Sequence, residues 1–183
     1  MKTFIQICVL GIVASLNLFG QSAPAKIGNF NVGDVVSDFS FTDFSGKPRN
    51  LSEFKGKTVL LDFWATWCSP CLADIPKLKV LYEKYGAQGF EIIGMDSETI
   101  GDDEAPDPAF AKETAERAKT VVKVRGAIWT QATAETAVPV AKSLFGVKAL
   151  PTKILIDRDG KIVAVIREKD DLEKAIASQM SRK

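Results

Sequence analysis

The chain has 183 residues, with 24 lysines and arginines against 23 aspartates and glutamates, so its formal net charge is +1. Nothing in this balance suggests nucleic acid or an anionic membrane surface as a partner. The length and an apolar content of 46% fit one domain with a sizeable core. With no histidine and three cysteines, the chain lacks the four-ligand sets typical of zinc centres.

Residues 1–22 predict a secretory signal peptide. Lys2 precedes a mostly apolar stretch over residues 4–19, and several small residues follow it. The stretch is shorter and more polar than a bilayer span of ~20 apolar residues, and a retained membrane anchor stays open as the alternative. Cys8 follows Ile7 near the start of the stretch, where a lipid-modified cysteine would not stand. We therefore expect an extracytoplasmic protein, periplasmic or secreted, whose mature chain keeps two cysteines.

Residues 23–32 are expected to be a linker, and one domain over residues 33–183 follows. Segments that predict strands alternate there with segments that predict helices. In chain order these are a β-hairpin that begins at 35–44 and turns at 45–47, a helical turn at 51–54, a strand at 58–65, a helix at 68–85, a strand at 90–95, helices at 107–125 and 137–145, paired strands at 152–156 and 162–166, and a terminal helix capped by Asp170. This alternation predicts an α/β sandwich with a mixed sheet.

Cys68 and Cys71 lie three residues apart where a strand passes into a helix. One helical turn brings their sulfurs within disulfide reach, and the helix N-terminus favours the thiolate of the first cysteine. Because only a thiolate attacks a disulfide, this geometry suits redox chemistry. A purely structural disulfide across one turn would constrain almost nothing. We expect Cys68 to be exposed and Cys71 to be shielded.

Asp62 lies in the middle of the apolar strand over residues 58–65. Burying a carboxylate is costly unless it is paired or protonated, so its pKa should be raised. A carboxyl with a raised pKa suits a proton acceptor for the second thiol.

The segment Phe63-Trp64-Ala65-Thr66-Trp67-Cys68 and the later Gly146-Val147 and Leu150-Pro151-Thr152 together resemble the thioredoxin superfamily, within it the TlpA/ResA-like branch of extracytoplasmic thiol-disulfide oxidoreductases. The resemblance covers the chain from about Gly33 to its C-terminus. It implies a thioredoxin-like sandwich with a mixed central sheet, an N-terminal β-hairpin and an insert between the sheet crossovers. It implies no organic cofactor and no metal.

The resemblance also implies roles for the redox residues. Cys68 attacks, Cys71 resolves the mixed disulfide, and the two form the redox disulfide. Asp62 lies beneath the second cysteine and relays its proton, although many members of the branch carry an amide at that position. Asp74 follows Cys71 by three residues, where the branch often has a glutamate that tunes the cysteines; an exposed helix acid is the open alternative.

Substrate contacts are implied at three further residues. Trp67 lies beside Cys68, and Pro151 faces the cysteines as a cis-proline, so that the backbone of Leu150 can pair with an extended partner chain. The implied partners are protein thiols and disulfides, with apocytochrome c or another exported protein as an example, and a membrane electron donor.

Ser69 and Pro70 place no histidine between the cysteines, and two acids lie close to them, which favours a reductant over an oxidant. A peroxiredoxin-like thiol peroxidase is one alternative, but it would carry a threonine where Ala65 stands. A non-catalytic binding module that uses the groove at Leu150 and Pro151 is the other.

Overall fold

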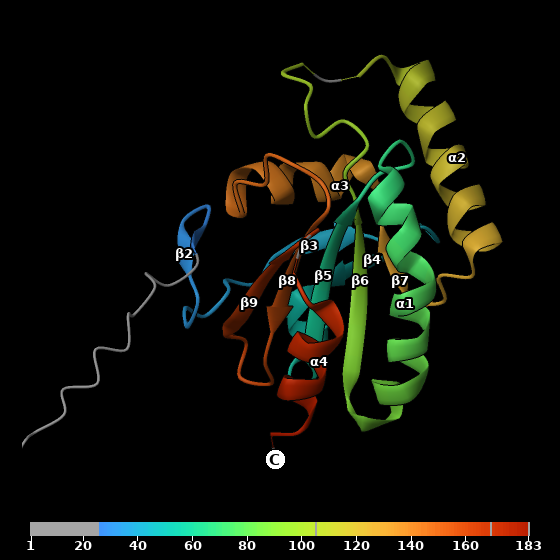
Figure 1. Ribbon diagram of the computed structural model, residues 1–183. Helices are drawn as coiled ribbons and strands as arrows, with labels where there is room; N and C mark the ends of the chain where they lie inside the picture. Colours follow the sequence, from blue (N-terminus) through green and yellow to red (C-terminus); the bar gives the residue numbers. More distant parts are fainter. Residues whose placement is uncertain (1–25, 105, 169, 183) are drawn as a thin grey trace, which may run out of the picture.

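A five-stranded mixed sheet forms the centre of the computed structural model, which describes residues 26–104, 106–168 and 170–182 (Figure 1). The predicted signal peptide over residues 1–22 lies outside these ranges. In spatial order the strands are β7 (Thr130–Ala132), β6 (Phe90–Asp96), β5 (Thr58–Trp64), β8 (Thr152–Ile156) and β9 (Ile162–Arg167). β5, β6 and β7 are parallel, whereas β8 and β9 run antiparallel to their neighbours. All seven residues of β5 are buried, as expected of a central strand.

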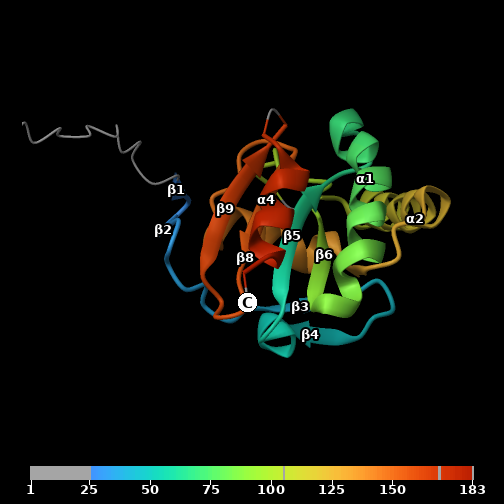
Figure 2. The same ribbon diagram turned by 60° about the horizontal axis from the view of Figure 1, so that its bottom comes forward.

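Helices cover both faces of the sheet. The helices α1 (Ser69–Tyr85) and α4 (Leu172–Met180) pack on one face, and the helix α3 (Ala134–Pro139) packs on the other. A π-helical segment, η3 (Val140–Leu144), continues α3. The helix α2 (Pro108–Arg125) lies beside α1, on the side away from α4 (Figure 1, Figure 2). The predicted α/β sandwich with a mixed sheet is confirmed.

Two short hairpins precede the sheet. The strands β3 (Ser40–Thr42) and β4 (Pro48–Asn50) form the predicted N-terminal β-hairpin, and the helical turn η1 (Leu51–Phe54) follows it as predicted. The strands β1 (Lys26–Ile27) and β2 (Phe30–Asn31) form a smaller hairpin inside the segment interpreted as a linker.

Backbone contact holds this smaller hairpin on the domain. Gly28 has a φ of +56°, and a Cβ at this position would lie 2.5 Å from the carbonyl carbon of Phe145. Only glycine allows this close approach. The neighbouring Ile27 is 5% exposed and belongs to the core. The described part of the predicted linker is therefore packed against the domain.

Several element ends were predicted from capping residues. Asp107 caps α2 as predicted, because its carboxylate accepts the backbone N–H groups of Ala109 and Phe110. The prediction for α4 was wrong by one residue: Asp171 caps the helix by accepting the Lys174 N–H, while the carboxylate of Asp170 accepts the Arg167 N–H.

The chain between β6 and α3 forms the predicted insert, and it contains one strand that was not predicted. The strand β7 has three residues and one of them is Gln131, so it carries neither the length nor the apolar run of the other strands. The helix α3 begins at Ala134 rather than Ala137. The short 3-10 turn η2 (Gly86–Gln88) follows α1. Within the described ranges, no helix is both long enough and apolar enough to cross a bilayer.

Candidate active site

Cys68 and Cys71 form a disulfide at the N-terminus of α1, with 5.3 Å between their Cα atoms. Cys68 is the N-cap residue of the helix, and its sulfur accepts the Cys71 backbone N–H at 3.3 Å. A helix N-terminus stabilises negative charge, so this position favours a thiolate on Cys68 after reduction.

The disulfide is more enclosed than expected. Cys68 is 4% exposed and Cys71 is 1% exposed, so the predicted contrast between an exposed and a shielded cysteine is small in the oxidised state. Ala118, Val121 and Val122 of α2 belong to the apolar cluster around the two cysteines. The insert therefore supplies part of the wall around the disulfide.

A buried glutamate holds the loop that leads into the cysteines. The carboxylate of Glu98 accepts the backbone N–H of Thr66 at 2.8 Å and its hydroxyl at 2.6 Å. The indole N–H of Trp67 donates to the backbone carbonyl of Glu98 at 2.8 Å, although the Trp67 side chain is 56% exposed. Three hydrogen bonds thus fix an exposed aromatic ring next to the disulfide.

Trp64 is buried, at 3% exposed, where β5 leads into this loop. Its indole N–H donates to the side-chain oxygen of Gln131 at 3.0 Å. Gly94 makes room for this contact, because a Cβ at Gly94 would lie 1.9 Å from the same oxygen. The unpredicted strand β7 therefore anchors Trp64 through Gln131.

Leu150 and Pro151 lie at the same end of the sheet. The peptide bond between them is cis, as the resemblance implied. Leu150 packs against the cluster that contains both cysteines. β8 begins directly after Pro151, at Thr152, which pairs with Phe63 of β5. The structure thus places the predicted substrate-contacting residues around the redox pair; their roles in binding stay a prediction.

Asp62 lies on the face of β5 that is turned toward α1. Side chains alternate along a strand, so Leu60, Asp62 and Trp64 share one face. Leu60 packs with residues of α1, and Trp64 packs with Cys68 and Cys71. Asp62 is therefore buried, at 3% exposed, beneath the helix that carries the cysteines.

A buried lysine joins the two predicted carboxylates. The ammonium of Lys153 lies 3.3 Å from Oδ1 of Asp62 and 2.9 Å from Oδ2 of Asp74. Lys153 is 2% exposed, whereas the Asp74 side chain is 21% exposed and also faces the surface ammonium of Lys77 at 3.4 Å. Asp74 is therefore linked to Asp62 through Lys153 and is only partly exposed, which differs from the exposed helix acid that was the alternative.

Burial and charge act on this cluster in opposite directions. Burial raises the pKa of Asp62 above its usual range, and the nearby Lys153 charge only partly offsets this. For Lys153, burial acts to lower the pKa, but the charges of Asp62 and Asp74 and the hydrogen bond to Asp74 raise it overall. The expected raised pKa of Asp62 thus agrees with its surroundings.

A second buried acid, Asp96, lies at the end of β6 opposite Trp64. It is 1% exposed, and Oδ1 accepts the backbone N–H of Glu98 at 3.1 Å. Burial, reinforced by the charge of Glu98, raises the pKa of Asp96 to about 7. The Asp96 carboxyl therefore gains or loses its charge near neutral pH. It lies two residues before Glu98, whose carboxylate binds Thr66.

We predict that Asp96 makes the protein less stable as pH rises. The folded-state pKa of about 7 exceeds the ordinary value of 3.8, so between these values the folded chain retains a proton that the unfolded chain has lost. The free energy of unfolding therefore falls over this range and stays reduced above it. An Asp96→Asn variant keeps the acceptor for Glu98 and does not ionise.

Urea unfolding at pH 4.5, 6 and 8 measures this effect. We expect the stability of Asp96→Asn relative to the native protein to rise with pH and to reach an advantage of roughly 2 kcal/mol at pH 8. This advantage is less than the full shift at about 1.4 kcal/mol per pKa unit, because the new amide NH₂ needs a partner and costs free energy at every pH. A stability difference that does not change with pH contradicts the prediction.

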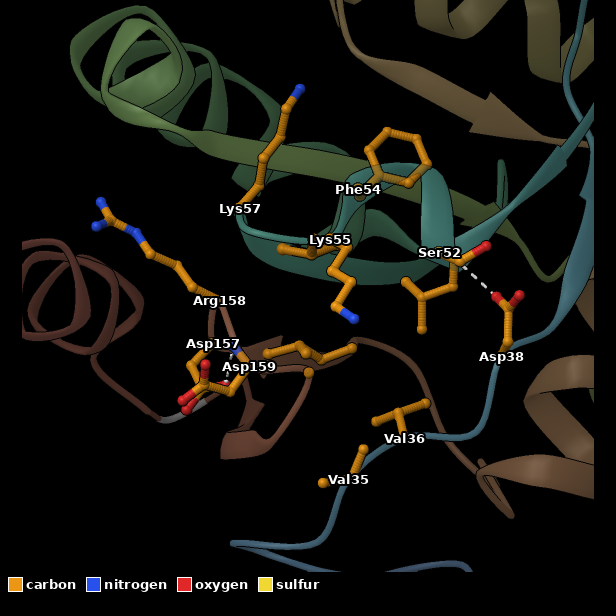
Figure 3. A pocket seen from close by; sticks show the side chains of 14 residues that line it. Val35, Val36, Asp38, Ser52, Phe54, Lys55, Lys57, Asp157, Arg158 and Asp159 are labelled. Carbon is orange, nitrogen blue, oxygen red and sulfur yellow. Dashed lines mark hydrogen bonds between the residues drawn. The ribbon is translucent and has the colours of Figure 1, made fainter.

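A surface pocket at the other end of β5 is separate from the cysteines (Figure 3). Val36, Phe54 and Lys57 line it together with Arg158, and Asp38 at its edge accepts the Ser52 backbone N–H at 2.9 Å. The pocket adjoins the first residues of β5, whereas the cysteines follow its last residue, about 20 Å away at ~3.3 Å per residue.

The site and the fold together define a class of protein. A Cys-x-x-Cys disulfide at the start of a helix, beside a cis-proline and above a buried acid on a mixed sheet, belongs to a thiol-disulfide oxidoreductase with the thioredoxin fold.

Comparisons with known proteins agree with this class. The family model described as Redoxin matches residues 31–180. The thiol-disulfide oxidoreductase ResA of Bacillus cereus is 34% identical over 154 residues, which are 84% of this chain and 80% of the relative. Among solved structures, the thioredoxin domain of a thiol-disulfide oxidoreductase from Bacteroides vulgatus is 28% identical, with a TM-score of 0.65 over 81% of this chain and 97% of that domain. A thiol:disulfide interchange protein from Bacteroides sp. is 29% identical, with a TM-score of 0.58 over 74% and 81%. The chain belongs to the Redoxin family and is a ResA-like member of the thioredoxin superfamily.

Sequence reasoning missed two residues of this site. Lys153 stands in the otherwise apolar strand β8, and a lone charge in a buried strand is the same signal that singled out Asp62. Glu98 follows the end of β6 in a polar loop, and nothing in its spacing pointed to Thr66, 32 residues earlier.

Proposed function

We propose that the protein is an exported enzyme that reduces disulfides in other proteins. The observation that carries this proposal is the Cys68–Cys71 pair at the N-terminus of α1, with a buried carboxyl on the strand face beneath it. The predicted signal peptide supports export, and the family supports protein thiols and disulfides as substrates.

In the proposed cycle, the Cys68 thiolate attacks one sulfur of a partner disulfide. The Cys68–partner bond forms, the partner disulfide breaks, and the departing partner sulfur takes a proton from water. Cys71 then gives its proton to the Asp62 carboxylate, and its thiolate attacks Sγ of Cys68. The Cys68–Cys71 disulfide forms, and the second partner sulfur leaves as a thiolate. The partner is reduced by two electrons, and the enzyme is oxidised by two.

Partner binding is proposed at the exposed ring of Trp67 and at the backbone of Leu150 beside Pro151. An extended chain adds to such an edge through main-chain hydrogen bonds. The resemblance to the TlpA/ResA-like branch supports apocytochrome c or another exported protein as the partner, and a membrane protein as the source of electrons.

We expect the cysteine pair to be a reductant. The carboxylates of Asp62 and Asp74 disfavour a thiolate near Cys71, and the chain has no histidine that could favour one. The potential should therefore be more negative than ~−180 mV, the value for protein disulfide isomerase.

A redox titration in glutathione or dithiothreitol buffers measures this potential. The direction of electron flow is then checked with a protein disulfide as substrate, with the reduced enzyme in excess. A potential near ~−120 mV, that of the strong periplasmic oxidant, contradicts the reductant.

A further inference from the structure

Lys153 is the one residue that touches both acidic groups near the cysteines among the described ion pairs. Its ammonium connects Asp62 on β5 to Asp74 on α1, at 3.3 Å and 2.9 Å. Lys153 comes from a third element, β8, where it pairs directly across from Asp62. Asp74 is one helical turn beyond Cys71, so the lysine ties the acid beneath the helix to the helix itself.

The charges of this cluster do not balance. The three groups that Lys153 joins carry a net charge of −1 when all are ionised, and two of them are almost fully buried. The further cation near Asp74, Lys77, is 72% exposed, so its charge is largely screened by water. Binding one proton makes the cluster neutral, which a low-dielectric site favours. Interacting groups of this kind hold a proton jointly, not one by one.

The cluster reaches water at a surface pocket. Asp74, Lys77 and Lys153 line a surface pocket that the β9–α4 segment closes from the other side. The charged groups that this segment brings to the pocket, among the described residues, are Arg167, Glu168, Asp170, Asp171 and Glu173. Asp62 does not line this pocket. It is connected to the pocket through Lys153, which does.

We propose that Lys153 is a positioning residue for the cysteine reaction, which holds the carboxyl of Asp62 in place and links it to Asp74 and to water. The proposal rests on the proposed function. When Asp62 has taken the proton of Cys71, the ammonium of Lys153 keeps its own proton and holds Asp62 and Asp74 in place. Asp62 then releases the proton to water, and the cluster returns to its starting charges.

The test compares Lys153→Met with Lys153→Arg in the full chain. Methionine keeps most of the length of the side chain but removes the charge, so Asp62 loses its only described cationic neighbour. A carboxyl that loses a charge partner within 4 Å has its pKa raised by about 1–3 units. We therefore expect the rate at which Cys71 resolves a mixed disulfide to fall at least ~10-fold at pH 6–7 and to recover at higher pH, as the pH–rate profile moves up by at least about one unit. Lys153→Arg should restore most of the rate at pH 6–7.

Lys77→Met is the matched control. It removes an ammonium that faces the same Asp74 carboxylate, but the Lys77 side chain is 72% exposed. We expect its pH–rate profile to match that of the native protein. A loss in Lys153→Met that is equal at every pH indicates a merely structural role and overturns the proposal.

A double variant shows whether Lys153 acts through Asp62. Adding Lys153→Met to Asp62→Asn removes both charges of the buried pair, so that neither is left buried alone as in Lys153→Met. We expect the added change to leave the profile of Asp62→Asn unmoved; a further shift overturns the proposal. If the native protein reduces disulfides and Lys153→Met has the same pH–rate profile, the proposed role of Lys153 is wrong while the proposed function stands. If the native protein itself reduces no disulfide, the proposed function fails.

Discussion

A Cys71→Ser variant is expected to stop at a covalent complex with its protein partner, linked through Cys68. Serine at this position cannot attack the mixed disulfide, so the second step of the proposed cycle has no nucleophile. Turnover should fall by about 10³-fold or more, because residues that act as one unit lose most of their activity together. Cys68→Ser should lose as much activity without forming the complex, since the sulfur that accepts the Cys71 N–H at the helix N-terminus is gone.

Non-reducing electrophoresis and intact mass measurement detect the complex, and a reductant should release it. The double Cys68→Ser/Cys71→Ser variant is the control, because it keeps the groove at Leu150 and Pro151 but has no redox pair. If the double variant keeps full biological activity, the protein is a binding module and the disulfide is incidental. If Cys68→Ser accumulates the complex in place of Cys71→Ser, the order of the two cysteines is reversed.

An Asp62→Asn variant is expected to lose about 100-fold in the resolution rate at pH 6, the lower end of what a positioned base contributes. The loss should shrink steadily toward pH 9, where solvent removes the thiol proton without help. Stopped-flow measurement of a preformed mixed disulfide, from pH 6 to 9, isolates this step from the first attack. If the pH–rate profile of the variant is parallel to that of the native protein, Asp62 is a structural residue. Asp74 is then the next candidate for the proton acceptor.

Glu91→Gln is a matched control for Asp62→Asn. Glu91 is also a buried acid of the sheet that pairs with a lysine, since Oε2 lies 3.0 Å from the ammonium of Lys57. This pair lies at the opposite end of the strands from the cysteines. We expect Glu91→Gln to keep the native pH–rate profile, which separates the loss of a base from the loss of a buried ion pair.

The same contacts correct one expectation about stability. From sequence, Asp62 is a carboxylate surrounded by apolar residues, and its replacement by an amide is expected to leave the fold equally or more stable because an isolated charge is removed. In the structure the charge is paired with Lys153. Asp62→Asn leaves that lysine with Asp74, so thermal unfolding must accompany the kinetics to show that the variant is folded under the assay conditions.

The parts of the fold that could be predicted from sequence are those with local causes. Seven successive buried residues in β5 and the cap at Asp107 each leave a pattern within a few residues. The cysteine pair is of the same kind, because its geometry follows from one helical turn. The three residues of β7 form a strand through their pairing with β6 and a bridge from Ala132 to Asp43, so no local pattern marks them.

The parts of the site that could not be predicted depend on which segments meet in space. Lys153 reaches Asp74 from 79 residues further along the chain, and Glu98 reaches Thr66 across 32. The exposure of Cys68 depends on α2, whose apolar face shields it. Such contacts follow from strand register and helix packing, which a single sequence does not encode in short patterns.

The buried pair of Asp62 and Lys153 also bears on how the central strands find their alignment. β5 and β8 are buried on both faces. The usual alternation of buried apolar and exposed polar side chains therefore cannot select one register between them. A slip of one residue would turn Lys153 to the opposite face, among Phe41, Phe63 and Phe145, and would leave both charges buried without a partner. Each unpaired buried ion costs several kcal/mol. The two residues proposed to handle the proton thus also make misaligned chains unstable, and a protein that lacks both would gain freedom to fold in the wrong register.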